Sequence, residues 1–189
     1  MILAGDLKKG SKILVNGEPF SVVDFQLVKP GKGGTYLRTK MKNLISGLVR
    51  EETFRSAEKL EQPDLETRPM QFLYADDTAY HFMDQDTYDQ IALDKDHVED
   101  VLDLLKEQEV YSILYFDNKP IAITPPLHMN IMVKEALPGV RGDTAQGAAT
   151  KQVTLETGLV INAPLFVEEG DILRIDTRTK NYIERVNKK

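Results

Sequence analysis

The 189-residue chain has no cysteine, no tryptophan and no long apolar run. The absence of cysteine excludes disulfides, thiolate catalysis and cysteine-ligated zinc or iron–sulfur sites. A membrane helix needs about 18 or more consecutive apolar residues, and the N-terminal segment MILAGDLKKG also lacks the apolar stretch and cleavage site of a secretory signal. We therefore expect a cytoplasmic protein without a membrane partner, whose apolar share of 41% suits folded modules.

Basic residues are scarce in the middle of the chain, and acidic residues are scarce near its start. The net charge of −6 divides into +4 for residues 1–63, −11 for 64–126 and +1 for 127–189. Residues 25–50 contain no acid and six basic residues: Lys29, Lys32, Arg38, Lys40, Lys42 and Arg50. This asymmetry fits either an anionic partner or a solvated basic strand face, and charge alone does not decide between them.

Short β-type runs separated by turn signals fill the first third of the chain. The expected strands are residues 12–15, 19–28, 35–44 and 48–54. Asn16-Gly17 predicts a tight turn between the first two strands. In the second strand Val23, Phe25 and Leu27 alternate with mostly polar neighbours, which predicts one apolar face. The pattern is typical of a small, strongly bent barrel.

The middle third changes from strands to one helix and back to strands. A polar segment at 56–69 indicates a domain boundary near residue 63. Asp96 and Glu99 resemble a capping pair, and the apolar residues from Val98 to Leu105 have the spacing of one helix face in a helix expected over 96–108. The expected strands are 70–75, 78–83, 88–93, 110–116 and 119–124. Three strands, a helix and two strands fit a five-stranded OB barrel.

The last third reads as a second five-stranded barrel. Pro125-Pro126 cannot continue a central strand, because neither nitrogen donates a hydrogen bond, so the pair marks the second boundary. The expected strands are 129–137, 152–155, 158–166, 171–176 and 182–186. The predicted fold class is therefore all-β, with three small barrels at 1–63, 64–126 and 127–189.

The segment 29–34, KPGKGG, lies between two predicted strands of the basic first part. Pro30 fixes its own φ, and three glycines remove side-chain bulk around Lys32 and allow positive φ. The sequence predicts a projecting lysine on a slim loop that can enter a narrow cleft, and an ordinary hairpin turn that contains a lysine is the alternative. A G-x-x-x-x-G-K-S/T phosphate loop is excluded, because the chain has Gln26 and Gly33 at two of its required positions.

No residue pattern indicates catalysis or metal binding. The adjacent carboxylates at 76–77 and 168–169 fall at predicted turns, and no G-x-S-x-G elbow is present. The three histidines have no zinc-ligand spacing and are scattered along the chain: His81, His97 and His128. We expect no catalytic residue, no metal, no cofactor and no enzymatic activity.

Several longer stretches together resemble bacterial elongation factor P over essentially the whole chain. They are AGDLKKG, NGEPF, VKPGKGG at 28–34, HFMDQDTYDQ at 81–90, ITPP at 123–126 and KEALPGVRGDTAQGAATKQVTLETGLVINAPLFVEEGDILRIDTRT. The resemblance implies an SH3-like (KOW-type) barrel followed by two OB-folds, in an L shape similar to tRNA, and a monomer. Relatives that carry hypusine lack the third barrel, which favours the bacterial branch.

The resemblance further implies a translation elongation factor that binds the ribosome beside peptidyl-tRNA and stimulates peptide bond formation at consecutive prolines. Lys32 matches the residue that extends toward the tRNA CCA end, and in many family members a lysine-modifying enzyme enlarges it. The residues expected to support the loop are Lys29, Pro30, Gly31, Gly33 and Gly34. The residues expected to contact RNA are Arg38, Lys40, Lys42, Arg141, Gly142, Asp143, Thr144, Tyr182 and Arg185. For Tyr182, packing within the fold is the alternative.

The alternative function is a general OB-fold RNA-binding protein without a role at proline stalls. Its affinity is expected to fall gradually as any basic residue at 25–50 is removed, and to fall steeply with salt. The translation-factor hypothesis instead makes Lys32 decisive for proline runs alone.

Overall fold

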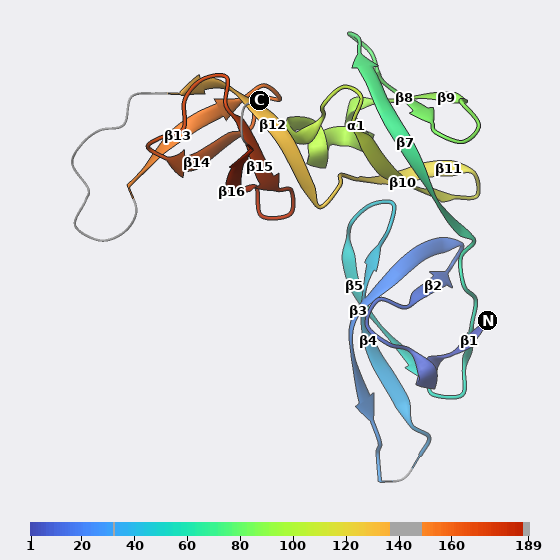
Figure 1. The fold of residues 1–189 in the computed structure, drawn as a ribbon. Coiled ribbons are helices and arrows are strands. Elements are labelled where there is room, and N and C mark those ends of the chain that lie inside the picture. The colour runs from blue at the N-terminus through green and yellow to red at the C-terminus, as the bar shows by residue number, and fades with distance from the viewer. Residues whose placement is uncertain (32, 137–148, 187–189) are drawn as a thin grey trace. The chain divides into compact units, whose positions relative to one another are not determined.

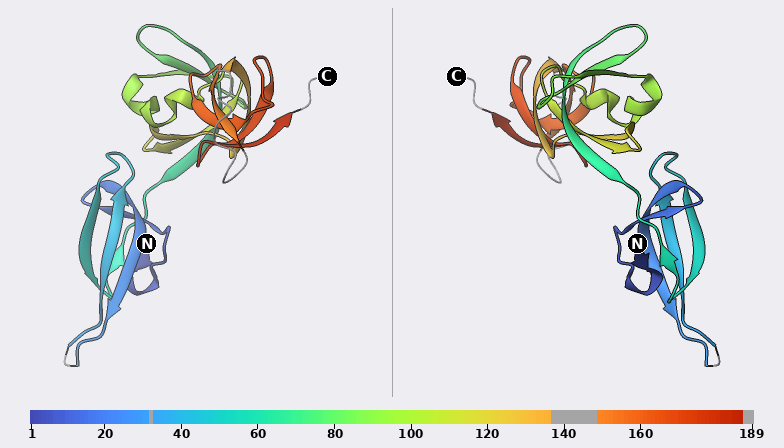
Figure 2. Two further views of the ribbon diagram at one scale, coloured as in Figure 1. Left: turned by 90° about the vertical axis from the view of Figure 1, so that its left-hand side faces the viewer. Right: turned by 90° about the vertical axis from the view of Figure 1, so that its right-hand side faces the viewer.

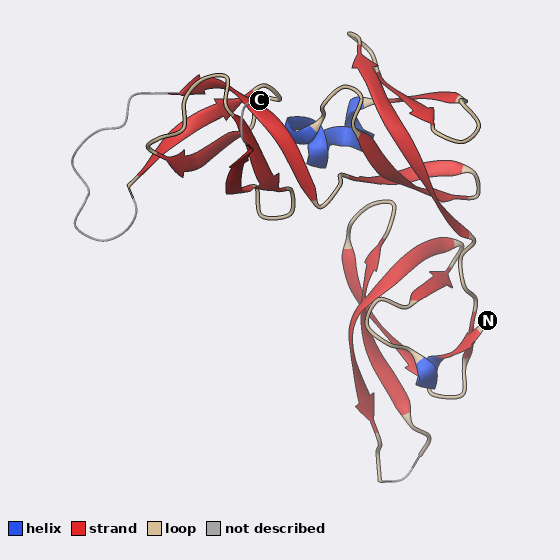
Figure 3. Ribbon diagram, viewed as in Figure 1, coloured by secondary structure: helices blue, strands red, loops and turns tan. Residues whose placement is uncertain are grey.

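The structure, a computed structural model, describes residues 1–31, 33–136 and 149–186. Strands dominate these residues, and the helical segments are short (Figures 1 and 3). The described strands form one four-stranded, one two-stranded and two five-stranded sheets, which confirms the all-β prediction. The chain divides into two compact units, residues 1–68 with 113–122 and residues 69–112 with 123–189. The division into three domains remains a prediction. Within the described ranges, no helix is long and apolar enough to cross a membrane.

The first sheet is antiparallel and has the order β2-β3-β4-β5. Its strands are β2 (Lys12–Val15), β3 (Glu18–Val28), β4 (Tyr36–Asn43) and β5 (Val49–Arg55). Nearby, β1 (Ile2–Leu3) pairs with β6 (Lys59–Leu60), and a 3-10 helix, η1 (Ala4–Asp6), follows β1. The buried apolar core of this part consists of Ala4, Leu7, Ile13, Val15, Phe20, Val22, Leu37, Met41, Phe54 and Leu60.

The predicted tight turn between β2 and β3 is present. Val15 pairs with Glu18, so Asn16 and Gly17 form a two-residue loop. Their φ angles are 53° and 80°, which matches the turn that suits the right-handed twist of a hairpin. The sequence pair Asn-Gly therefore fixes the register of this hairpin.

The second half of β3 is an edge with exposed apolar side chains. β2 pairs only with residues 18–21 of β3, whereas β4 continues beside β3 to its end. A register shift follows Val22, where β3 leaves the core. The predicted alternation is present, but its apolar residues lie outside the core, because β2 has already ended. Their exposed fractions are 44%, 37% and 47% for Val23, Phe25 and Leu27.

Part of the segment predicted as a polar linker at 56–69 is strand. β6 pairs with β1 through Leu60 and Ile2, and β7 begins at Leu65, five residues before the predicted start at Met70. Leu60 is 7% exposed and belongs to the N-terminal core. One buried leucine in a polar stretch is too weak a periodic signal to predict a strand.

The second sheet has the order β11-β10-β7-β8-β9. Its elements are β7 (Leu65–Ala75), β8 (Tyr80–Asp84), β9 (Gln90–Leu93), α1 (Lys95–Val98), the 3-10 helix η2 (Glu99–Leu104), β10 (Val110–Phe116) and β11 (Lys119–Thr124). Three strands, a helical segment and two strands follow the predicted order. The buried residues of this part include Phe72, Phe82, Val98, Leu104, Tyr111 and Ile113.

The helical segment ends at Leu104, earlier than the predicted helix over 96–108. Its N-terminus is capped by a different residue than the predicted one. The carboxylate of Asp94 accepts the N–H of His97 at 3.2 Å and caps α1, so the predicted pair at 96 and 99 is wrong. Only one α-helical turn forms before η2 continues as a 3-10 helix. Aspartate at the N-cap satisfies backbone donors that the first turn leaves free.

A buried tyrosine ends the helical segment. The Tyr111 hydroxyl donates to Leu104 O at 2.7 Å and accepts the Lys106 N–H at 2.9 Å. These two backbone groups therefore find a side-chain partner and do not continue a helical ladder. The prediction of helix to residue 108 is wrong because this side-chain contact from β10 outweighs the local apolar spacing.

The third sheet has the order β14-β13-β12-β15-β16. Register shifts in β12 and in the β15–β16 pair bend these strands. The predicted strands are present with boundaries that differ by a few residues: β12 (His128–Ala136), β13 (Thr150–Leu155), β14 (Val160–Pro164), β15 (Ile172–Asp176) and β16 (Asn181–Val186). Its buried residues include Met129, Ile131, Val133, Val153, Leu155, Ile161, Ala163, Leu173 and Ile175.

Thr39 on β4 is fully buried, and its hydroxyl has no hydrogen-bond partner among the described residues. A buried unsatisfied polar group costs about 1–3 kcal/mol. The near-isosteric Thr39→Val is therefore expected to raise the free energy of unfolding by about 1 kcal/mol, measured by urea denaturation. The exposed Thr53 on β5 supplies the control, because Thr53→Val removes a solvated hydroxyl and should change stability little. A less stable Thr39→Val protein would contradict this expectation.

Candidate nucleic-acid interface

The loop between β3 and β4 follows the last strand pair, Val28 with Tyr36. Figures 1 and 2 show the two strands running out together as a narrow hairpin. Lys32, the predicted tip, lies outside the described residues. The other predicted loop residues are all exposed: Lys29, Pro30, Gly31, Gly33 and Gly34. The hairpin therefore carries an exposed loop with little side-chain bulk.

Gly33 is the loop glycine whose conformation requires glycine. Its φ is 128°, a region that other residues rarely adopt, and a Cβ there would lie 3.7 Å from Pro30 Cγ. A Cβ added at Gly31 or Gly34 would meet open space, and neither residue has a positive φ. The sequence allowed a positive φ at all three glycines, but only Gly33 has one. Gly31 and Gly34 instead keep the loop narrow, because they carry no side chain.

Three predicted RNA-contacting residues share one face of β4. Arg38, Lys40 and Lys42 are exposed and alternate with buried residues along the strand. We call these three side chains the β4 stripe. A row of cations at strand spacing can contact phosphates without reading a base sequence.

The acid-free run at 25–50 has acidic neighbours in space. Asp24 on β3 and Glu51 on β5 lie opposite Lys40. Asp24 also forms an ion pair with Lys9 at 2.8 Å. The hydrogen bond from the Lys9 ammonium, followed by that from the Phe25 N–H, lowers the pKa of Asp24, so this acid stays charged. The local positive charge of the β4 stripe is therefore smaller than the sequence run indicates.

Arg50, the last basic residue of that run, has protein partners. Its guanidinium carbon lies 4.3 Å from the centroid of the buried Phe20 ring, and its Nη2 lies 3.2 Å from Glu52 Oε2. Stacking on an aromatic face and pairing with a carboxylate are stabilising roles. Arg50 is thus accounted for by the fold.

Arg185 also has partners that the sequence analysis missed. Its guanidinium lies 5.1 Å from the Phe166 ring centroid, and its Nη1 lies 3.3 Å from Asp171 Oδ2. Asp171 is only 9% exposed, and a carboxylate so placed needs a charged or hydrogen-bonding partner. No spacing rule links these positions, because the pairing of β15 with β16 brings Arg185 next to the turn between β14 and β15. RNA contact by Arg185 remains a prediction for a side chain that is already paired.

The other predicted residues of the last third divide into two groups. Tyr182 is half-buried and lies opposite Ile175 in the β15–β16 pair, a position compatible with the packing alternative. The predicted loop residues Arg141, Gly142, Asp143 and Thr144 lie outside the described residues.

Two of the three histidines pair with nearby aspartates. His81 Nε2 lies 2.7 Å from Asp76 Oδ2, and His97 Nδ1 lies 2.6 Å from Asp94 Oδ1. Backbone hydrogen bonding from Thr78, followed by the His81 contact, holds the pKa of Asp76 well below its usual range. Within the described ranges, no group of three or more histidine, aspartate or glutamate side chains is placed to hold a metal ion. The Asp76–His81 pair orders the turn between β7 and β8, and the Asp94–His97 pair lies at the N-terminus of α1.

Family models match almost the whole chain in three consecutive pieces. Residues 3–60 match the elongation factor P KOW-like domain, residues 65–123 the elongation factor P OB domain, and residues 129–185 the elongation factor P C-terminal domain. Together with the three large sheets, these matches define a translation factor built from a KOW-like barrel followed by OB-type barrels.

Curated relatives agree with the family models. The chain is 47% identical over 188 residues to elongation factor P of Desulfosudis oleivorans, covering 100% of both chains. It is 49% identical over 186 residues to elongation factor P of Thermoanaerobacter sp. strain X514, covering 98% of this chain and 100% of the relative. The chain belongs to the elongation factor P family.

Two solved structures share part of the fold. Eukaryotic translation initiation factor 5A from Methanococcus jannaschii matches with a TM-score of 0.57 and 23% identity, over 66% of this chain and 93% of that chain. An initiation factor 5A family protein from Naegleria fowleri matches with a TM-score of 0.51 and 14% identity, over 65% and 96%. At such identities the likeness concerns the fold alone.

Family membership establishes a role in translation elongation and, with it, interaction with the ribosome and tRNA. Members of this family are translation factors and generally not enzymes. The exposed hairpin loop and the β4 stripe are the described parts of the first sheet that suit contact with RNA.

Asp176 orders the turn that precedes Tyr182 and generates a pH prediction. Its carboxylate lies 2.9 Å from Arg178 Nη2 and accepts the backbone N–H of Arg178. The side-chain hydrogen bond from Arg178 is the main reason that the pKa of Asp176 falls from 3.8 to about 2. Because folding lowers this pKa, the ionised carboxylate stabilises the turn above pH 3.8, and the contribution is lost as the pH falls through about 2.

An NMR titration of the Asp176 carboxyl carbon is expected to give a midpoint near 2 in the wild type. In Arg178→Gln the midpoint should move up toward 3.8, because the charged donor is gone. An unchanged midpoint in Arg178→Gln would show that the backbone donors alone set the pKa.

Proposed function

We propose that the protein binds the ribosome beside peptidyl-tRNA and stimulates peptide bond formation at consecutive prolines, with Lys32 orienting the tRNA CCA end. The observation that carries the proposal is the narrow β3–β4 hairpin, whose described loop residues are exposed and nearly free of bulk (Figure 2). A cation at such a position can reach into a cleft that a wider loop cannot enter. Family membership supplies the ribosomal setting.

The proposed mechanism is positional and needs no chemical step by this protein. Proline is a secondary amine with a locked φ, so it samples reactive geometry poorly. Holding reactants in an attack-ready geometry is worth about 7–11 kcal/mol in favourable systems, and a small part of that suffices to relieve a stall. An ammonium that contacts the tRNA end restricts its motion while the ribosome performs the peptide transfer.

The other residues proposed to contact RNA differ in how exposed they are and in how many acidic neighbours they have. The β4 stripe is exposed along one strand face, although Asp24 and Glu51 reduce its field. Arg185 and Tyr182 would contact RNA only through the parts that the fold leaves exposed. We propose that the three barrels at 1–63, 64–126 and 127–189 act together as a cytoplasmic monomer.

We also propose that Lys32 is extended by a lysine-modifying enzyme. A longer amine-bearing side chain reaches further from the same narrow loop, and the open space around Gly31 and Gly34 leaves room for an enzyme to approach. Intact-mass analysis of protein purified from its native cells is expected to show an added group that maps to Lys32. A wholly unmodified mass would contradict this part of the proposal.

The central experiment compares Lys32→Ala with the wild type in reconstituted translation. On a message that encodes Pro-Pro-Pro, the variant is expected to lose at least about tenfold in the rate of peptide bond formation, which corresponds to about 1.4 kcal/mol of barrier. On a control message without proline runs, the rates should match. Lys29→Ala, which removes an exposed lysine from the same loop, is the matched control and should retain most activity. Equal loss on both messages would favour the general RNA-binding alternative.

The β4 stripe should behave differently from Lys32. Replacing Arg38 and Lys42 with alanine removes two exposed cations and should weaken ribosome binding with a shallower salt dependence, because fewer counterions are released. At saturating factor the effect on the proline-run message should disappear. The double variant Lys8→Ala with Lys59→Ala, at two exposed positions outside the stripe, is the charge-matched control. A defect that persists at saturation would mean that the stripe orients the tRNA and does not merely bind it.

A further inference from the structure

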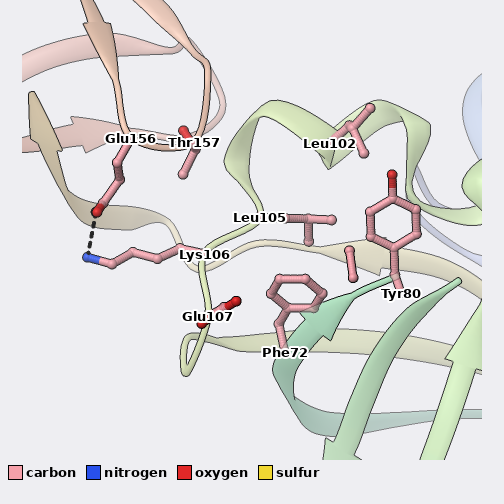
Figure 4. Close-up of a pocket in the computed structure, with 9 residues that line it drawn as sticks. Phe72, Tyr80, Leu102, Leu105, Lys106, Glu107, Glu156 and Thr157 are labelled. Carbon is pink, nitrogen blue, oxygen red and sulfur yellow. Dashed lines mark ion pairs between the residues drawn. The ribbon is translucent and has the colours of Figure 1, made fainter. Parts of the chain in front are cut away.

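A pocket of about 500 Å³ lies in the second compact unit and takes no part in the proposed function (Figure 4). Phe72, Ala75 and Tyr80 come from β7 and β8, and Leu102 and Leu105 come from η2 and the residue after it. The other wall is formed by Lys106 and Glu107 and by the turn between β13 and β14, with Glu156 and Thr157. Its volume lies within the range of about 300–1,000 Å³ found for small-molecule sites.

The apolar side of this pocket is incompletely covered. The Phe72 and Tyr80 rings lie 6.5 Å apart, centroid to centroid, at an interplanar angle of 33°. Phe72 is buried, but Tyr80, Leu102 and Leu105 are only half-buried. A flat apolar body placed against these side chains would remove further apolar surface from water, at about 25 cal/mol per Å².

The loop that carries Lys106 and Glu107 is rigidly held. The Gln108 N–H donates to Phe72 O at 2.8 Å, and the Phe72 N–H donates to Glu109 O at 2.9 Å. Gln108 has a φ of 66°, a conformation that a non-glycine residue keeps only when its surroundings impose it. The Lys106 N–H is held by the Tyr111 hydroxyl. The pocket wall is therefore formed before any ligand arrives, which favours binding.

The rim of the pocket has one uncompensated acid. The Lys106 ammonium donates to Asn130 O at 2.7 Å and pairs with Glu156 at 3.2 Å (Figure 4). Its charge is thus matched by Glu156. Glu107 is exposed and forms no ion pair with any residue that the structure describes. The pocket therefore combines an aromatic floor with a net charge of one negative unit at its edge.

We propose that this pocket binds a small aromatic amine, with its ring on Phe72, Tyr80 and Leu105 and its ammonium at Glu107. An anion is disfavoured because it would approach Glu107 and Glu156, while the Lys106 ammonium is already engaged by two oxygens. A neutral aromatic would fill the apolar part but gain nothing at Glu107. The ligand would touch residues of both five-stranded sheets, so binding should stabilise the second compact unit.

Tryptamine is a suitable probe because the protein contains no tryptophan, so indole fluorescence reports the ligand alone. Its anisotropy is expected to rise and saturate as full-length protein is added, with a dissociation constant on the order of 1 mM. Tryptophol, the neutral analogue, should bind a few-fold more weakly, and indole-3-propionate, the anion, at least about tenfold more weakly. Equal affinity for all three indoles would overturn the proposal.

Three variants locate the binding. Ala75→Leu fills the pocket from an exposed strand position and should abolish saturable binding, with a thermal melt to verify that the protein is folded. Glu107→Gln should reduce the affinity for tryptamine to that for tryptophol. Asp100→Asn removes an exposed acid of η2 outside the pocket and should leave binding unchanged. Equal loss in Glu107→Gln and Asp100→Asn would reveal only diffuse attraction to an acidic surface. Because Lys32→Ala should bind tryptamine like the wild type, failure here is distinguishable from failure of the proposed function.

Discussion

The pairing of β3 with β4 is the constraint on which the functional part of the structure depends. This pairing runs from Phe20 opposite Asn43 to Val28 opposite Tyr36. At the barrel end, the buried Phe20 side chain fixes β3. Opposite it on β4, the Asn43 side chain donates a hydrogen bond to Glu18 and accepts one from the backbone N–H of Ile45. Because side chains alternate along a strand, a slip of one residue would move every member of the β4 stripe into the core. The position of the hairpin loop is therefore set by core packing far from it.

The same pairing explains why a basic sequence gives only a moderately basic surface. Antiparallel neighbours bring residues from outside the 25–50 run next to Lys40, and two of these are acids. Opposite charges on adjacent strands stabilise the sheet by a few tenths of a kcal/mol to about 1 kcal/mol. They also reduce long-range attraction to phosphate. A hairpin that places its loop accurately but attracts phosphate only moderately suits a factor that must bind the ribosome and then dissociate from it.

The sequence predicted strands well where pattern and turn chemistry are local. Asn16-Gly17 specified its turn, and the alternation along β4 specified which side chains face solvent. It failed where distant residues decide the outcome. Leu60 is buried by residues of the N-terminal core, and Arg185 is paired with Asp171 because β16 runs beside β15. The exposed apolar end of β3 was also missed, because only the register shows where β2 stops. Local periodicity carries no information on such contacts.

Tyr111 connects the largest error in the predicted secondary structure to the pocket. Burial raises the pKa of its hydroxyl, so the group keeps its proton and donates to Leu104 O while it accepts from Lys106. Those two bonds end η2, and the chain then turns so that Gln108 can bond the backbone of Phe72. A helix that continued to residue 108 would place Lys106 and Glu107 within a helical turn, without the backbone bonds to β7 that now hold this loop. The pocket thus exists because one buried side chain replaces a turn of helix with a fixed loop.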